Sequence, residues 1–322
     1  MVYFGYYKRF WSALVYILFI LLLFYFYFYF QNKKINVLKA VLLIGFLTLF
    51  SYPFLSHDFF NYLFDAKILT FYGKNPYQFS ALDFSNDSWT RFMHWTHRTY
   101  PYGPTFLAIT AIPSFFSFGK FFLAFFLFKL TWFLFYFLMV YLSYKVDKKW
   151  SLILAFHPLI IVEGLINNHN DLLALSISVM ATYFLIKQKN KILSIVFFII
   201  SGGIKYLSLP FVLLVFKKKL IKVLSLFLVF ILIIYLAFFR EIHPWYFLIF
   251  FAFYPFFSKL IERLNFFFAG LLFSYFPYLF LGGWDSLEKI NQKHIIISIF
   301  LALNLVYLSF FYVKENKQLF EK

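Results

Sequence analysis

Long apolar runs alternate with short polar loops along most of the chain. A membrane-spanning helix needs about 20 predominantly apolar residues, and continuously apolar runs predict helices rather than alternating strands. Short runs are candidates for half-helices or re-entrant segments, which are tolerated when they are buried against other helices. The runs are 10–30, 36–55, 104–118, 121–144, 151–166, 172–186, 192–216, 223–239, 245–257, 265–281 and 295–313.

This pattern predicts an all-α fold, a polytopic transmembrane bundle of about 10–11 helices that include short or re-entrant ones. No internal repeat or linker interrupts it, so we expect a single domain over residues 1–322. Segment 192–216 leaves one basic loop and returns to another, so it is either a re-entrant hairpin broken at Gly202–Gly203 or a segment whose loops are assigned to the wrong side. One of the runs 104–118 and 121–144 is expected not to cross. The runs 104–118 and 245–257 are the shortest candidates for half-helices.

Composition supports a membrane protein. The chain is 63% hydrophobic and 13% charged, with a mean hydropathy of +0.79, whereas soluble domains are nearer 45–50% apolar. The first run is too long for a signal-peptide core and is expected to be a retained span. The sequence has no cysteine, which excludes disulfides, thiol catalysis and cysteine-ligated metals.

The net charge of +17 is distributed in short lysine clusters between the apolar runs, which argues against nucleic-acid binding and for the positive-inside rule. One set of loops, with Lys39, holds 18 of the 30 basic residues and only four acidic ones, and we assign it to the cytoplasm. These loops contain Lys33–Lys34, Lys145–Lys149, Lys187–Lys191, Lys217–Lys222, Lys259–Arg263 and the C-terminal tail. The loops 56–103, 167–171, 240–244 and 282–294 then face the opposite side.

Residues 56–103 form the one long loop on that opposite side, and long ordered loops are usually functional. Its first part predicts a helix, since Asp58, Asn61, Tyr62 and Asp65 share one face. We expect this helix to lie in the membrane interface with its carboxylates toward water. A solvated amphipathic helix without function is the alternative. Asp58 differs from the other acids because it directly follows an apolar run, where a carboxylate is costly and often functional.

The second part of the loop is rich in Trp, His, Arg and Tyr. An interfacial aromatic belt accounts for the rings, while sugars also pack on aromatic faces and an arginine such as Arg98 holds phosphate well. His57, His94 and His97 with Asp58 raise the question of a metal. Their spacing matches no standard ligand set, so a divalent cation is an alternative that the spacing does not support.

Four motifs in order resemble the GT-C superfamily of membrane glycosyltransferases that use polyprenyl-phosphate sugars, in particular the bacterial α-mannosyltransferase branch. The first is Asp58 after a span with Tyr62, then Gly73–Tyr77, then Tyr100–Pro104. The second is His157–Leu159 with Glu163 and Asn167–Asp171. The third and fourth are Gly203–Tyr206 followed by Pro210, and His243–Tyr246. Together they cover residues 57–246.

The resemblance implies a sugar donor on polyprenyl phosphate, a glycan, lipid or protein acceptor, and inversion in one displacement. Mannose is the sugar it favours. It also implies a multi-pass protein of the bacterial plasma membrane with its site on the outer face, and no certain cofactor. On this basis Asp58 is the candidate general base, and the candidate donor-phosphate ligands are Arg98, Lys205, Tyr102 and Tyr206. The candidate pocket residues are His57, Tyr62, Asn75, Tyr77, Glu163, His169, Asn170, Asp171 and Trp245.

Other interpretations stay open at this point. Lys205 could simply snorkel to the membrane surface, and Asp171 could serve only the positive end of a helix dipole. A secondary transporter or lipid flippase is the main alternative function, but it would show inverted repeats and ionisable residues at mid-membrane. The chain has no visible repeat, and its polar residues gather on one face. A purely structural membrane subunit is the third alternative, and it would not need the ordered motifs.

Overall fold

The computed structural model describes residues 2–283 and 286–320, and the side chains of 8–283 and 286–312. Every regular element in these described residues is a helix, which confirms the predicted all-α fold. Contacts divide the chain into two units, residues 33–252 and residues 1–32 with 253–322. Each unit is described by itself. The single domain expected from the sequence stays a prediction.

The described residues contain five helices that are long and apolar enough to cross a membrane, which confirms a multi-pass membrane protein. The run 245–257 lies in the segment Pro244–Glu262, which is long and apolar enough to cross a membrane but is kinked at Phe257. By contrast α4 (Pro104–Phe115) has 12 residues and falls short of a span, while α5 (Phe121–Val146) reaches one. The five helices are Lys8–Gln31, Phe121–Val146, Lys219–Phe239, Pro244–Glu262 and Leu287–Tyr312.

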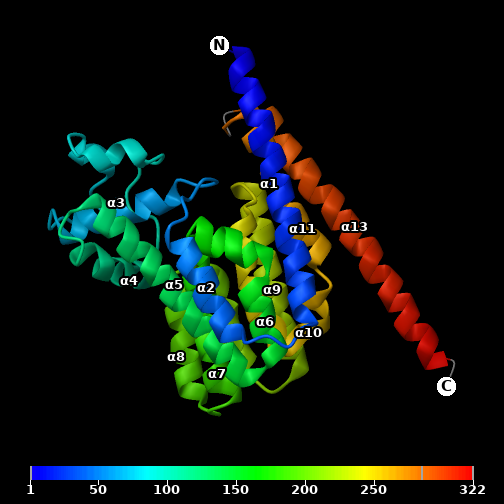
Figure 1. The fold of residues 1–322 in the computed structure, drawn as a ribbon. Coiled ribbons are helices and arrows are strands. Elements are labelled where there is room, and N and C mark those ends of the chain that lie inside the picture. The colour runs from blue at the N-terminus through cyan, green and yellow to red at the C-terminus, as the bar shows by residue number, and fades with distance from the viewer. Residues whose placement is uncertain (1, 284–285, 321–322) are drawn as a thin grey trace. The chain divides into compact units, whose positions relative to one another are not determined.

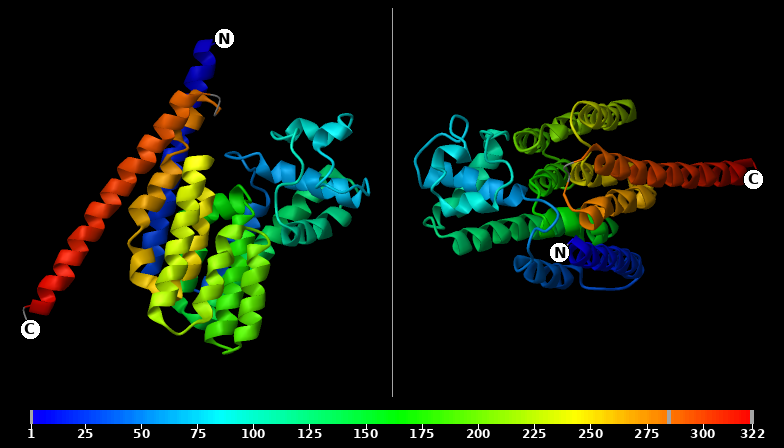
Figure 2. Two further views of the ribbon diagram at one scale, coloured as in Figure 1. Left: turned by 180° about the vertical axis from the view of Figure 1, so that it is seen from behind. Right: turned by 90° about the horizontal axis from the view of Figure 1, so that it is seen from above.

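The unit of residues 33–252 holds the predicted site (Figure 1). Figures 1 and 2 show α3, η1, η2 and α4 gathered on one side of this unit, away from the loop that joins α7 and α8. Its elements are α2 (Val37–Leu49), α3 (Asp58–Thr70), η1 (Ala81–Phe84), η2 (Ser88–Phe92), α4, α5, α6 (Lys148–Phe156), η3 (Ile160–Ile166), α7 (Asp171–Ile186), α8 (Lys191–Gly202), η4 (Tyr206–Val215), α9 (Lys219–Phe239) and η5 (Pro244–Phe253).

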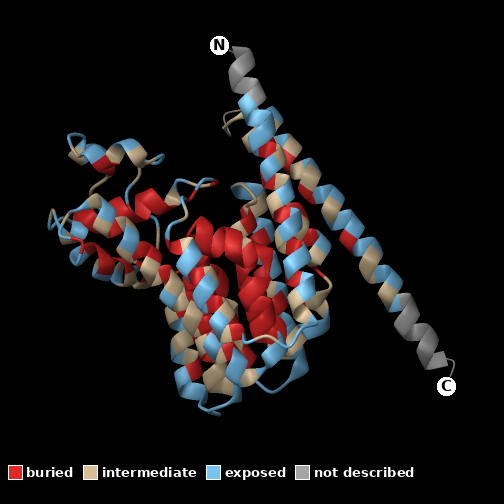
Figure 3. Ribbon diagram, in the orientation of Figure 1, coloured by how far each residue is buried: buried red, intermediate tan, exposed pale blue. Residues whose placement is uncertain are grey.

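A broken helix occupies the centre of this unit (Figure 3). α6 and η3 meet at a 63° bend after His157, where Pro158 cannot continue the ladder of hydrogen bonds. The segment is apolar on all sides and almost wholly buried, as a central helix should be. The backbone carbonyls that the break leaves unpaired need hydrogen-bond donors in an interior without water. Lys129 of α5 supplies them, with Nζ 2.9 Å from the oxygen of Ile166 and 3.3 Å from that of Leu165.

The predicted break in segment 192–216 is confirmed. α8 ends at Gly202, and η4 begins at Tyr206 and packs back along α8. Figures 1 and 2 show the chain returning to the end from which α8 starts. Hydroxyls hold the turn, because Ser201 Oγ lies 2.8 Å from Ser208 Oγ and donates to Ala174 O at 2.7 Å. The hairpin therefore presents Lys205 at its tip.

The loop 56–103 differs from the expected interfacial helix in one respect. α3 forms where predicted, but its polar face is buried rather than turned to water. The later part of the loop folds over it, so that Asn61 Nδ2 donates to Trp95 O at 3.0 Å and Lys67 pairs with Asp87. The expectation of carboxylates facing water is wrong for Asp65. The face is covered because its polar groups find partners inside the loop itself.

Two glycines join this loop to the α8–η4 hairpin. A Cβ on Gly103 would overlap the backbone oxygen of Gly203, and a Cβ on Gly203 would overlap Thr105 Oγ1. Small residues allow such close backbone approach in membrane proteins. The contact brings the Tyr100–Pro104 motif beside the Gly203–Tyr206 motif, although a hundred residues separate them in the sequence.

The second unit contains α1 (Val2–Gln31), α10 (Tyr254–Glu262), α11 (Asn265–Phe273), α12 (Phe276–Leu281) and α13 (Leu287–Phe320). α1 packs on α11 and α12, and α13 packs on α11. Tyr16 donates to Leu272 O at 2.9 Å, and the amide of Phe267 donates to Asn304 Oδ1 at 3.1 Å. Large apolar side chains of α13 are exposed, as expected for a surface that contacts lipid.

We predict that Gly103→Ala destabilises the protein by about 1–3 kcal/mol, because the added methyl group must displace backbone rather than a side chain. Thermal unfolding of the protein purified in detergent measures the effect. Gly164→Ala is the matched control, since its Cβ would meet only the flexible tip of Leu172. Equal melting temperatures for Gly103→Ala and the parent chain would contradict the close approach.

Candidate functional site

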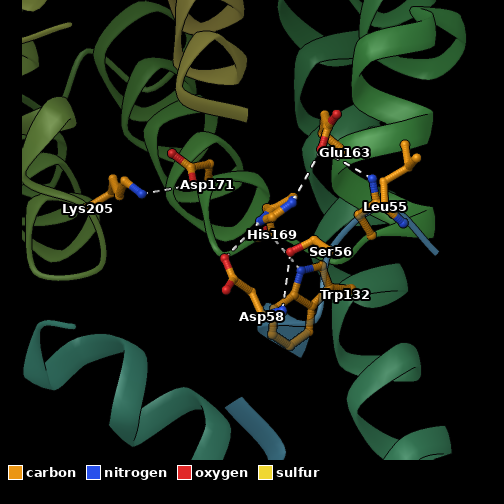
Figure 4. A network of polar contacts seen from close by, with 9 residues as sticks. Leu55, Ser56, Asp58, Trp132, Glu163, His169, Asp171 and Lys205 are labelled. Carbon is orange, nitrogen blue, oxygen red and sulfur yellow. Dashed lines mark hydrogen bonds and ion pairs between the residues drawn. The ribbon is translucent and has the colours of Figure 1, made fainter. Parts of the chain in front are cut away.

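Asp58 begins α3, and its position is set by the segment before it. The amide of Leu55 donates to Asn167 Oδ1 at 3.3 Å, and the amide of Asp58 donates to Ser56 Oγ at 3.2 Å. Figure 4 shows Asp58 at one side of a network of buried polar groups. Its side chain keeps 18% of its surface exposed. The backbone at Asp58 is therefore held by hydrogen bonds, while part of its side chain is exposed.

The turn Asn167–Asp171 between η3 and α7 forms the wall behind Asp58, and all five of its residues are buried. Asn168 adopts a positive φ of 56°, which asparagine tolerates better than most residues. Trp132 Nε1 donates to His169 O at 3.0 Å and holds the turn against α5. His169 then points between two carboxylates, with Nδ1 3.7 Å from Asp58 Oδ2 and Nε2 3.3 Å from Glu163 Oε2.

Trp245, at the start of η5, covers the ring of His169. The two rings are stacked with centroids 3.8 Å apart and planes at 15°, and His243 stacks on Trp245 at 4.1 Å. The sandwich fixes the plane of the imidazole, so that its two nitrogens face Asp58 and Glu163 rather than rotating away. The His243–Tyr246 motif and the Asn167–Asp171 motif therefore meet.

Lys205 and Asp171 form an ion pair next to this wall (Figure 4). Lys205 Nζ lies 3.2 Å from Asp171 Oδ2 and 4.7 Å from the centroid of the Tyr246 ring. Asp171 is 1% exposed, whereas the Lys205 side chain is 13% exposed. The lysine is directed toward a buried carboxylate and not to the membrane surface, which argues against snorkelling. Its charge also acts on Asp58.

Arg98 also acts electrostatically on Asp58. Its guanidinium lies 3.8 Å from Asp65 Oδ2 and over the ring of Tyr102, at 5.6 Å from the ring centroid. Arg98 Nη1 is buried without a hydrogen-bond acceptor. Tyr102 packs edge-on against Tyr62 at 5.3 Å, and the Tyr62 ring stacks on Trp132. Two cations, Arg98 and Lys205, therefore act electrostatically on Asp58.

Burial and charge set the ionisation of the groups outside the spans. Burial raises the pKa of Asp58 above its usual range, although Arg98 and Lys205 oppose the shift. Burial raises the pKa of Asp65 to about 7, with Arg98 again opposing. Burial holds the pKa of His169 well below its usual range, and Lys205 adds to the effect. The imidazole of His169 is therefore neutral at physiological pH.

Several predicted residues lie at the edge of this cluster or outside it. Asn75 is exposed and its Oδ1 accepts the amide of Tyr77 at 3.0 Å, so it shapes a turn. Tyr77 OH donates to Tyr102 O at 3.1 Å and supports that segment from outside. His57 is exposed and Nδ1 donates to Phe92 O at 3.2 Å. Tyr206 is largely exposed at the start of η4, and Asp171 influences it electrostatically.

Other predicted residues are placed deeper. Glu163 is fully buried and accepts from Asn167 Nδ2 at 3.3 Å, behind His169. Asn170 is buried at the start of α7, where its Nδ2 has no hydrogen-bond partner. The sequence interpretation did not include Asp65 as a partner of Arg98, nor Trp132 and Tyr246 as supports. Asp65 had a signal, because it shares a helix face with Asp58. Trp132 had none, because it is one aromatic residue in an apolar run.

A metal ion bound by the protein needs several donor side chains that converge on one point. Among the residues that the structure describes, no group of three or more His, Asp or Glu side chains converges as metal ligands do. His57 and His94 have ring centroids 6.3 Å apart, and each lies on the exposed side of the loop. The arrangement can chemically accept a proton at Asp58 and stabilise an anion between Arg98 and Lys205.

Comparison with known proteins gives one family. The model of the N-terminal domain of the alpha-(1->6)-mannopyranosyltransferases, the MptA/B family, matches residues 10–221, which is more than half of the chain. Neither the comparison with curated proteins nor that with solved structures gives a match. The matched residues include the turn Asn167–Asp171, α3 and the Lys205 hairpin. The chain therefore belongs to the alpha-(1->6)-mannopyranosyltransferase family and is a membrane glycosyltransferase.

Proposed function

We propose that the chain transfers mannose from a polyprenyl-phosphate donor to an acceptor hydroxyl, with inversion at the anomeric carbon and Asp58 as general base. One observation carries the proposal, a partly open carboxylate on which two cations act electrostatically. A single displacement needs one base for the acceptor proton and positive charge for the departing phosphate. Asp58, Arg98 and Lys205 supply these groups, and the alpha-(1->6)-mannopyranosyltransferase family supports mannose as the sugar.

Asp58 is the best placed of the four neighbouring carboxylates for the role of base. Its side chain is 18% exposed, whereas those of Asp65 and Asp171 are 4% and 1% exposed and that of Glu163 is fully buried. An acceptor hydroxyl must reach the base directly. The raised pKa of Asp58 also makes its carboxylate a stronger base than that of an ordinary aspartate.

Arg98 and Lys205 are suited to the phosphate. Arg98 Nη1 is a buried donor without an acceptor, and a guanidinium binds phosphate oxygens in a fixed geometry. Lys205 lies at the tip of the broken hairpin, with Asp171 compensating its charge when no donor is bound. Tyr102 and Tyr206 are the nearby hydroxyl donors, Tyr102 beside Arg98 and Tyr206 next to Lys205 in the chain.

The donor is a lipid, so the site must be reachable from the bilayer. The apolar helices supply that environment, and the asymmetry of lysine and arginine across the loops supports an outer-face site in a bacterial plasma membrane. The acceptor is a glycan, lipid or protein hydroxyl, of which a glycan agrees best with the family. The family match favours this transferase over a transporter or a lipid flippase.

We predict that Asp58→Asn lowers transfer by about 10²–10⁴-fold, because the amide cannot take the acceptor proton. The assay supplies polyprenyl-phosphate mannose and a mannoside acceptor to the purified protein and identifies the product. Asp83→Asn, an exposed substitution in the same loop, is the control and should retain activity. Full activity of a normally folded Asp58→Asn protein would refute the assignment.

The pH dependence of kcat/KM should reflect the ionisation of the Asp58 carboxyl group. A base must be ionised, so kcat/KM should fall as the pH drops through the raised pKa of Asp58, above the range of an ordinary aspartate. The charged and titratable groups near Asp58 include Arg98, Lys205, His57, His94, His169, Asp65 and Asp171. Asp65→Asn removes a negative charge and should shift the acid limb to lower pH. An unshifted limb in that variant would contradict the coupling.

Lys205→Met should raise the donor KM more than the acceptor KM, because the lost charge faces the phosphate. The substitution also leaves Asp171 buried without its partner, which is costly. The double variant Lys205→Met/Asp171→Asn removes both charges and is the matched control for that cost. We expect the double variant to recover thermal stability but not the donor KM. An unchanged donor KM in both proteins would show that the lysine is structural.

A further inference from the structure

His169 lies between Asp58 and a second carboxylate that cannot contact the substrate. Its Nδ1 faces Asp58 Oδ2 at 3.7 Å, and its Nε2 faces Glu163 Oε2 at 3.3 Å (Figure 4). Glu163 is fully buried behind the ring, on the far side from the open face of Asp58. A pocket residue would touch the sugar, whereas Glu163 contacts the imidazole and Asn167 Nδ2 behind it. Its position therefore calls for a role other than binding.

The imidazole is constrained to one orientation. Trp245 stacks on its face, and Trp132 Nε1 holds its backbone oxygen at 3.0 Å. A neutral imidazole carries one N–H and one lone pair, so it can receive a proton at one nitrogen while it releases a proton from the other. Two carboxylates flank its two nitrogens, but neither nitrogen makes a hydrogen bond in this structure, so a proton passes only when the side chains move closer. Burial keeps the pKa of His169 low, which favours the neutral ring that such a path needs.

We propose that His169 and Glu163 form a buried proton relay that resets Asp58, an inference that rests on the proposed transferase function. The acceptor oxygen forms its bond to the anomeric carbon as the bond to the phosphate breaks, and its proton passes to Asp58. Asp58 then passes a proton to His169 Nδ1 while His169 Nε2–H passes its proton to Glu163 Oε2. Asp58 is again a carboxylate, Glu163 is protonated, and the imidazole is neutral in its other tautomer. Once the products leave, the reverse shift returns the proton to Asp58, whose exposed face releases it to water, and the starting tautomer is restored.

The relay answers a physical difficulty of this site. A protonated Asp58 cannot act again until it loses its proton, and bound lipid and sugar cover its open face during the reaction. A route through the protein lets Asp58 lose its proton, and Arg98 and Lys205 favour the ionised form of its carboxyl group. His169 and Glu163 act through Asp58, so they are positioning residues and not catalytic ones.

The first test uses His169→Ala and small heterocycles with the full-length protein. We expect kcat to fall by about 10²-fold with little change in the donor KM. 4-Methylimidazole carries both a donor and an acceptor nitrogen, so it should restore activity. 1-Methylimidazole has the same size but lacks the second exchangeable proton, so it should not. Equal rescue by both compounds, or rescue by neither, would overturn the relay.

The second test uses Glu163→Gln, which keeps the size of the side chain and an oxygen for Asn167 but cannot take a proton. We expect a lower kcat with an unchanged donor KM and an unchanged melting temperature. A variant with the parent kcat, or one whose defect lies in KM and stability alone, would show that Glu163 is structural. The double variant Asp58→Asn/His169→Ala should not respond to 4-methylimidazole, because the relay begins at Asp58.

The proposed transferase function and the relay are distinguished by different results. If the parent protein transfers no mannose, or if Asp58→Asn is fully active, the proposed function itself is wrong. If the parent protein transfers mannose and requires Asp58, but His169→Ala and Glu163→Gln retain its kcat, only the relay is wrong.

Discussion

The unit of residues 33–252 depends on one constraint, that a charge or an open carbonyl inside a dry bundle must have a partner. Leaving an ion unpaired there costs several kcal/mol. Lys129 meets the constraint for the broken end of η3, and Lys205 meets it for Asp171. The Arg98 guanidinium lies farther from its carboxylate, 3.8 Å from Asp65 Oδ2, and its Nη1 has no hydrogen-bond acceptor. The site is the place where this compensation is left incomplete, so that an anionic ligand can complete it.

Breaks in helices create the site. The bend after His157 ends η3 in the turn Asn167–Asp171, and the break at Gly202–Gly203 presents Lys205 at a hairpin tip. Regular helices would have satisfied these backbone groups and left the side chains dispersed along the membrane. The close approach of Gly103 and Gly203 then joins the two regions. Polar side chains from distant segments converge because each segment is irregular where it meets the others.

Much of the site could be predicted because its residues are unusual for their surroundings. Asp58, Glu163 and Lys205 are ionisable groups in or beside apolar runs, where they persist only with a reason. Sequence reasoning was less successful for α3, because a periodic polar face does not reveal that the loop folds back over it. Asp65 was placed toward water for that reason, although it is buried beside Arg98. Trp132 could not be found, since nothing in its run distinguishes a supporting indole from a lipid-facing one.

Local hydropathy, charge and glycine content were enough to predict the membrane class, the helical fold, the break at Gly202–Gly203 and the polar loop that begins at Asp58. Tertiary packing sets which polar residues face one another. The placement of His169 between Asp58 and Glu163, and of Lys205 against Asp171, depends on contacts between segments far apart in the chain. Local pattern carries no information about such pairs, since their energies arise only when packing removes water from both partners.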